Sequence, residues 1–115
     1  MAKAMDFAAK VYQVTKIFPR DEIYGLTSQL RRAAVSVAAN IAEGQGRQST
    51  GEFRQFPRHA GGSLLEAETH ILLAQRMEYA SDSATSSLLE DAAELGAHPE
   101  WADRIFREGQ TLTGH

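Results

Sequence analysis

The chain has 115 residues and a formal net charge of −3, and its 43% hydrophobic and 23% charged residues fall in the ordinary range of globular domains. It contains no cysteine, which excludes a disulfide scaffold, thiolate metal ligands and a cysteine nucleophile and favours a cytoplasmic location. No apolar run approaches the roughly 20 residues that cross a bilayer, so we expect one soluble domain without a membrane segment.

The charge is divided unevenly along the chain. Residues 1–60 carry a net charge of +4, and residues 61–115 carry a net charge of −7. A basic half is typical of proteins with an anionic partner. The two halves can equally attract each other, within one domain or between subunits, and both explanations stay open at this point.

The spacing of apolar residues predicts four helices and no strands, over about residues 2–17, 25–43, 50–78 and 83–108. Pro19 ends the first helix, because the residue before a proline is driven out of the helical region. Gly44 is expected to stop the second as a left-handed cap. Short connections favour antiparallel neighbours, so the predicted fold is all-α, an antiparallel up-down four-helix bundle.

The third predicted helix opens on a capping box, in which Ser49 and Glu52 bond each other's backbone amides. Pro57 then stands about two turns inside that helix, where a proline removes one backbone hydrogen bond and bends the chain. The fourth helix starts near Asp82, which can cap it, and is interrupted near residues 96–99.

The helix predicted at residues 25–43 is apolar on two sides. Its second apolar side holds Val35, Ala38, Ala39 and Ala42. A helix with two apolar sides is normally buried on both, whereas each helix of a four-helix monomer leaves one side in water. We therefore expect a subunit interface here, with small alanine side chains that let a second helix approach closely.

Several strings in the first two-thirds of the chain are specific: Tyr24-Gly25-Leu26-Thr27-Ser28-Gln29-Leu30-Arg31-Arg32, Asn40-Ile41-Ala42-Glu43-Gly44, Glu52-Phe53 and Gly62-Ser63-Leu64. Over about residues 6–79 the chain resembles the bacterial four-helix bundle proteins of the 23S rRNA-intervening sequence family, and also the accessory proteins of diversity-generating retroelements. The resemblance implies a ring-like homo-oligomer, typically a pentamer, that binds nucleic acid through basic surfaces. It does not imply an enzyme, and we expect no cofactor.

The candidate nucleic-acid-binding residues are four arginines, Arg31, Arg47, Arg54 and Arg58. Arg54 and Arg58 are four residues apart, on one face of the predicted third helix. Repeated around a ring, such residues would form a belt of positive charge that holds phosphates by releasing counterions. Few aromatic residues are interleaved with them, so binding would follow the phosphate backbone with little sequence specificity.

A second group of polar residues is predicted to be structural: Arg32, Asn40, Glu43 and Glu66. Asn40 and Glu43 could form an active-site pair, but buried polar groups more often satisfy one another. Asn40 has Ser36 within plausible reach, and Arg32 is expected to pair with Glu43 or with the carboxylates of the third helix.

Two kinds of reactive site are not predicted. His59, Glu66 and His70 share one flank of the third helix, but bundle di-metal sites use a Glu-x-x-His spacing that is absent here. Serine and histidine occur without the strand–turn–helix elbow of a hydrolase. The sequence therefore predicts a non-enzymatic oligomeric helical protein that binds RNA or DNA as an accessory factor. The alternative is a protein-interaction scaffold without nucleic-acid binding.

Overall fold

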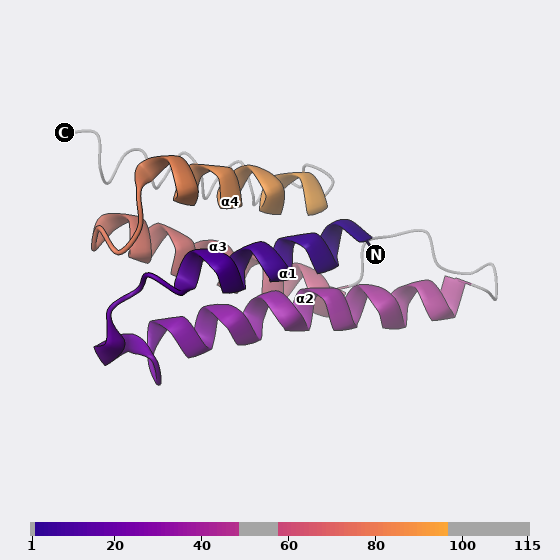
Figure 1. The fold of residues 1–115 in the computed structure, drawn as a ribbon. Coiled ribbons are helices and arrows are strands. Elements are labelled where there is room, and N and C mark those ends of the chain that lie inside the picture. The colour runs from indigo at the N-terminus through magenta and orange to yellow at the C-terminus, as the bar shows by residue number, and fades with distance from the viewer. Residues whose placement is uncertain (1, 49–57, 97–115) are drawn as a thin grey trace.

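The computed structural model describes residues 2–48 and 58–96, with the backbone alone for residues 45–48 and for Arg58. It contains four α-helices and one short 3-10 helix: α1 (Ala2–Thr15), η1 (Arg20–Glu22), α2 (Leu26–Gln48), α3 (Arg58–Arg76) and α4 (Asp82–Leu95) (Figure 1). No strand occurs in these two described stretches. The predicted all-α class is confirmed.

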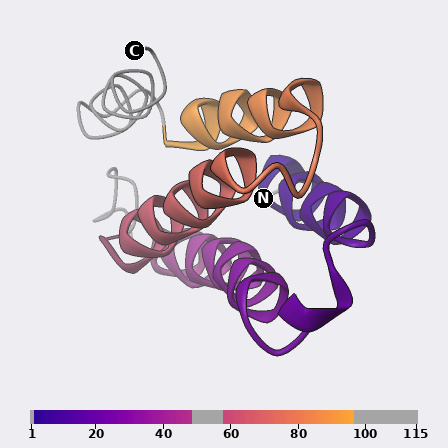
Figure 2. The same ribbon diagram turned by 90° about the vertical axis from the view of Figure 1, so that its left-hand side faces the viewer.

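Each helix packs against two others around one core. α1 contacts α2 and α4, and α3 contacts the same two helices from the other side. Figure 2, which looks nearly along the helices, shows α2 and α4 on opposite sides with α1 and α3 between them. The interior therefore collects one apolar face from each of the four.

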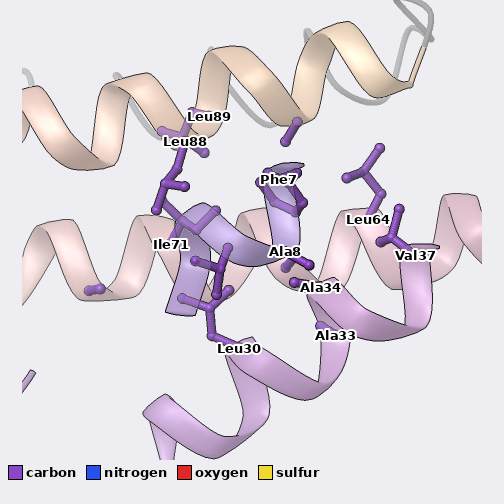
Figure 3. Packing of buried hydrophobic residues seen from close by; sticks show 14 of the residues in the cluster. Phe7, Ala8, Leu30, Ala33, Ala34, Val37, Leu64, Ile71, Leu88 and Leu89 are labelled. Atoms are coloured by element: carbon purple, nitrogen blue, oxygen red, sulfur yellow. The ribbon is translucent and has the colours of Figure 1, made fainter. Parts of the chain in front are cut away.

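The core is formed by side chains that recur every three or four residues, as one face of a helix requires. Figure 3 shows side chains of all four helices pointing toward one another. The fully buried ones include Phe7, Leu30, Leu64, Ile71 and Leu88. Several facing positions are alanines, which lets the helices approach closely.

α1 ends two residues before its predicted limit. The amides of Lys16, Ile17 and Phe18 each bond the carbonyl oxygen three residues earlier, which tightens the chain into a turn before Pro19. The turn directs Phe18 into the core, where its ring lies 5.6 Å from the ring of Tyr79. Pro19 thus acts as predicted, with a short tightening ahead of it.

Glu22 joins the connection between α1 and α2 to the connection between α3 and α4. Its Oε1 accepts the amide of Leu26, at the start of α2, at 2.9 Å. Its Oε2 accepts the Tyr79 hydroxyl at 2.7 Å. The amide bond, followed by the hydroxyl bond, lowers the pKa of Glu22, and the same hydroxyl bond raises the pKa of Tyr79. One carboxylate therefore caps α2 and links two distant loops.

Replacing Gly25 with alanine is expected to lower stability by about 1 kcal/mol, since it removes the cap of α2. A Cβ at Gly25 would lie 2.6 Å from Glu22 Oε1, so the carboxylate would have to leave Leu26. The matched change is Gly62→Ala in α3, where nothing lies within 4 Å of the added atom. This second variant should gain about 0.5–1 kcal/mol. Urea unfolding of both variants measures the difference, and a Gly25→Ala protein as stable as the parent would contradict the cap.

α2 is longer than predicted. It continues through Gly44 and Gly46 to Gln48, so the predicted stop at Gly44 is wrong. A glycine costs a helix only about 1 kcal/mol relative to alanine. That cost does not end a helix whose preceding turns are packed into the core, and Gly44 itself is buried.

α3, as described, begins at Arg58 and ends at Arg76. The predicted capping box of Ser49 and Glu52 and the predicted bend at Pro57 lie outside the described residues. At the other end, the Tyr79 amide bonds the Ala74 carbonyl and the Glu78 amide bonds the Gln75 carbonyl. With Glu78 at a φ of 61°, this is a Schellman motif built on a residue other than glycine.

α4 is capped one residue earlier than predicted. The Ser81 hydroxyl accepts the Ala84 amide at 3.1 Å, and Asp82 is the first helical residue. Serine and aspartate both serve as N-caps. Ser81 is the cap here because its backbone is extended, as an N-cap residue requires. α4 then ends at Leu95 with Gly96 as its C-cap, at the start of the break predicted near residues 96–99. The last predicted helical piece lies beyond residue 96, outside the described residues.

Candidate functional site

An open cleft of about 410 Å³ lies beside the N-terminal half of α2. This volume falls in the range of about 300–1,000 Å³ that is usual for small-molecule sites. Side chains from α1, from the α1–α2 connection and from α2 line it: Tyr12, Ile23, Thr27, Ser28, Arg31, Arg32 and Val35. No acidic residue is among these described lining residues, so the cleft is positive in character.

Arg31 is held in a defined position at this cleft. Its Nε donates to the Thr15 hydroxyl at 2.8 Å, and one terminal nitrogen donates to the Tyr12 carbonyl at 3.3 Å. Its guanidinium lies over the Tyr12 ring, 4.6 Å from the ring centre. These contacts use part of the five N–H donors of an arginine and fix the direction of the rest.

The other lining residues supply one more cation, two hydroxyls and two apolar walls. Arg32 is exposed and forms no ion pair within the described parts of the chain. Thr27 is 4% exposed, and its hydroxyl has no hydrogen-bond partner among the described residues. Ile23 and Val35 are 54% and 46% exposed, so both present apolar surface at the cleft.

The structure describes only part of the predicted nucleic-acid-binding set. Arg31 is described in full and lines the cleft. Arg47 lies in the last turn of α2 and Arg58 is the first residue of α3, and in both cases only the backbone is described. Arg54 lies outside the described residues. The prediction for these three side chains stays a prediction.

The predicted structural cluster is only partly formed. Asn40 donates to the Ser36 carbonyl at 2.8 Å and to the Ser36 hydroxyl at 3.0 Å, and Ser36 Oγ lies 2.7 Å from Ser63 Oγ on α3. Asn40 therefore has the Ser36 partner that the sequence suggested.

Arg32, Glu43 and Glu66 do not belong to that cluster. All three are exposed, and no hydrogen bond or ion pair joins them within residues 2–48 and 58–96. The expected pairing of Arg32 with a carboxylate is wrong. These side chains project from α2 and α3 into solvent. An ion pair between exposed side chains stabilises a fold by less than about 1 kcal/mol, which is too little to fix the two side chains in one arrangement.

Among the described side chains the buried ionisable one is Glu68, which the sequence analysis did not single out as a core residue. It is 0% exposed, and neither carboxylate oxygen has a hydrogen-bond partner in the described part of the chain. Burial raises its pKa to about 8. The signal was its spacing, since Glu68 stands four residues after buried Leu64 and three before buried Ile71.

Other kinds of site were sought in the described residues. No group of three histidine, aspartate or glutamate side chains is placed there to hold a metal ion. None of the described helices is both long and apolar enough to cross a bilayer. The ion pairs found join α1 to α4, with Lys3 bonded to Glu94 at 2.6 Å and Lys10 to Asp91 at 2.8 Å.

The second apolar side of α2 is divided between the core and the surface. Ala38 is buried within the protomer, at 5% exposure. Val35, Ala39 and Ala42 are exposed. The uncovered apolar strip of α2 is therefore formed by these three residues, and the expectation that Ala38 belongs to a subunit interface is corrected.

Comparison with known proteins gives one finding about ancestry. A significant match among curated proteins was not found. The family model described as 23S rRNA-intervening sequence protein matches residues 1–98, which is most of the chain and includes all four helices. The chain therefore belongs to the 23S rRNA-intervening sequence protein family.

Proposed function

We propose that this chain is a non-enzymatic cytoplasmic protein that assembles with copies of itself and binds RNA or DNA as an accessory factor. The observation that carries the proposal is the state of Arg31 and Arg32. Neither is paired with a carboxylate among the described residues, while Lys3 and Lys10 are. Unpaired arginines on one surface can exchange counterions for phosphates. The family description names 23S rRNA, which makes RNA the first nucleic acid to test.

In the proposed assembly each protomer is an up-down four-helix bundle, and several protomers form a ring, with five as the expected number. The exposed strip of Val35, Ala39 and Ala42 supports the association, because alanines allow a close helix–helix contact. In such a ring the arginines of successive protomers would repeat at regular intervals. A long phosphate backbone could then contact several of them at once, which multiplies a weak single contact.

Binding to nucleic acid should weaken steeply with salt. Changing Arg47, Arg54 and Arg58 together to alanine should weaken it further, while the contacts of Arg31 and Arg32 remain. Each lost phosphate contact lowers the log–log slope by about 0.9 on duplex DNA. Fluorescence anisotropy with a labelled RNA and a labelled DNA duplex, from about 50 to 200 mM salt, measures this slope. Arg76→Ala is the matched control, since Arg76 is an exposed arginine at the far end of α3.

The second candidate function is a protein-interaction scaffold. The same exposed apolar strip favours it, because that strip can bind another protein as well as a second copy. An unmodified protein that binds neither RNA nor DNA at about 50 mM salt would contradict the nucleic-acid proposal and favour the scaffold. Far-UV circular dichroism of the triple arginine variant shows whether its folding, rather than its binding, was lost.

A further inference from the structure

The cleft beside α2 combines two features, and few classes of ligand would use both of them. One is positive charge without a balancing acid, from Arg31 and Arg32. The other is an apolar wall, from Ile23, Val35 and the Tyr12 ring. A bare anion would not need the wall, and a neutral apolar molecule would not need the arginines. The ligand that fits is an anion attached to a flat or apolar body.

The polar groups of the cleft favour a phosphate as that anion. Arg31 is oriented by Thr15 and by the Tyr12 ring, so its remaining N–H donors are presented in a fixed direction. Planar guanidinium groups bind phosphate oxygens through paired hydrogen bonds. Ser28 adds a half-buried hydroxyl. The Thr27 hydroxyl has no partner within residues 2–48 and 58–96, and a rotation of its side chain toward the cleft would give it a ligand oxygen to bond.

We infer that this cleft binds one nucleotide, with its phosphate on Arg31 and Arg32 and its base or sugar against Ile23, Val35 and Tyr12. The inference rests on the proposed function insofar as the nucleotide is part of an RNA or DNA strand. A free mononucleotide offers the same chemistry and is the other source. In a strand, the cleft would fix the path of the backbone at one point per protomer.

The cleft is separable from the contact proposed between protomers. Val35 borders both, but Arg32 lies one turn before it, and Ala42 lies two turns after it on α2. A change at Arg32 therefore tests the nucleotide without touching the alanines. Arg32 is exposed and unpaired within the described residues, so its replacement by glutamine should leave the fold unchanged.

The test measures binding of adenosine 5′-monophosphate to the full chain by equilibrium dialysis and by saturation-transfer NMR. Adenosine and inorganic phosphate serve as the two half-ligands. We expect the monophosphate to bind more tightly than either half, and Arg32→Gln to weaken it about tenfold, as expected for one charged hydrogen bond. Arg76→Gln, which removes an exposed arginine outside the cleft, should leave this binding unchanged.

Three outcomes would overturn the inference: no monophosphate binding at millimolar concentration, equal binding by Arg32→Gln and the parent, or inorganic phosphate binding as tightly as the monophosphate. A competition against labelled RNA identifies the source. If RNA binds and the monophosphate displaces it, the strand occupies the cleft. If the monophosphate binds but RNA does not, the proposed function fails while the cleft is a site for a free nucleotide. If RNA binds and neither the monophosphate nor Arg32→Gln affects it, the strand does not use the cleft.

Discussion

Replacing Glu68 with glutamine is expected to make the stability of this protein nearly independent of pH between about 5 and 8, whereas the parent loses stability across that range. Glu68 is fully buried and has no hydrogen-bond partner in the part of the chain that the structure describes, and burial raises its pKa from 4.5 to about 8. In that window the folded chain keeps a proton that the unfolded chain releases. Stability therefore falls as pH rises through the window, and it is fully present only below the unfolded pKa.

The expected loss is large for a single residue. Each pKa unit corresponds to about 1.4 kcal/mol, so the full shift amounts to on the order of 4 kcal/mol between pH 4.5 and 8. At pH 5 the neutral acid and glutamine are alike, and the two proteins should be about equally stable. At pH 8 the glutamine protein should be the more stable one. Urea unfolding at both values, at one protein concentration, measures the difference.

The control is Glu66→Gln, two residues earlier on α3. Glu66 is exposed, so its replacement should change stability by less than about 0.5 kcal/mol at either pH. A parent protein that is equally stable at pH 5 and pH 8 would show that Glu68 does not carry its proton in the folded state. A Glu66→Gln protein that is equally stable at pH 5 and pH 8, beside a parent that is not, would assign the pH dependence to Glu66 rather than to Glu68.

Glutamate substitutions at Ala38 and Ala42 are expected to have opposite consequences, although the two residues are only one turn apart on α2. Ala38 is 5% exposed and faces the other helices of its own protomer. A glutamate there would place a charge in the core, which costs about 3–5 kcal/mol or prevents folding. Ala42 is exposed, so the same substitution should leave the helices intact and dissociate the assembly.

Circular dichroism and light scattering after size exclusion separate these effects. The parent should have a mass several times 12.6 kDa. The Ala42→Glu protein should keep its helical spectrum and shift to a single chain, and the Ala38→Glu protein should lose helical signal. A parent that is monomeric at micromolar concentration would rule out the proposed self-association. An Ala42→Glu protein that stays assembled would move the contact to another face.

The positions of the helices could be predicted because their causes are local. The helical spacing of apolar residues predicted the positions of all four helices. Pro19 marked the end of α1 and Gly96 the end of α4. The end of α2 could not be predicted from Gly44, because packing along the whole helix outweighs the cost of one glycine. The choice of Ser81 over Asp82 as a cap depends on backbone angles that neither residue type determines.

The candidate site was less predictable, because it depends on how helices face each other. Arg31 was identified from its charge, but its attachment to Tyr12 and Thr15 requires the crossing of α1 and α2. The burial of Glu68 was not predicted, since charged residues are seldom fully buried without a partner. The cleft includes Ile23, whose position depends on the short helix η1, for which the apolar pattern gave no signal.

The bond between Glu22 and Tyr79 has a consequence for the order in which the chain folds. The pairs α1–α2 and α3–α4 are each connected by a short segment, so each can form a helical hairpin through contacts that are close in sequence. Glu22 and Tyr79 are 57 residues apart, and their bond requires both hairpins to be in place. The entropy of closing that long loop is lost before the bond forms. We therefore expect the bond between Glu22 and Tyr79 to form after the main folding barrier. It should then slow unfolding and leave the rate of folding nearly unchanged.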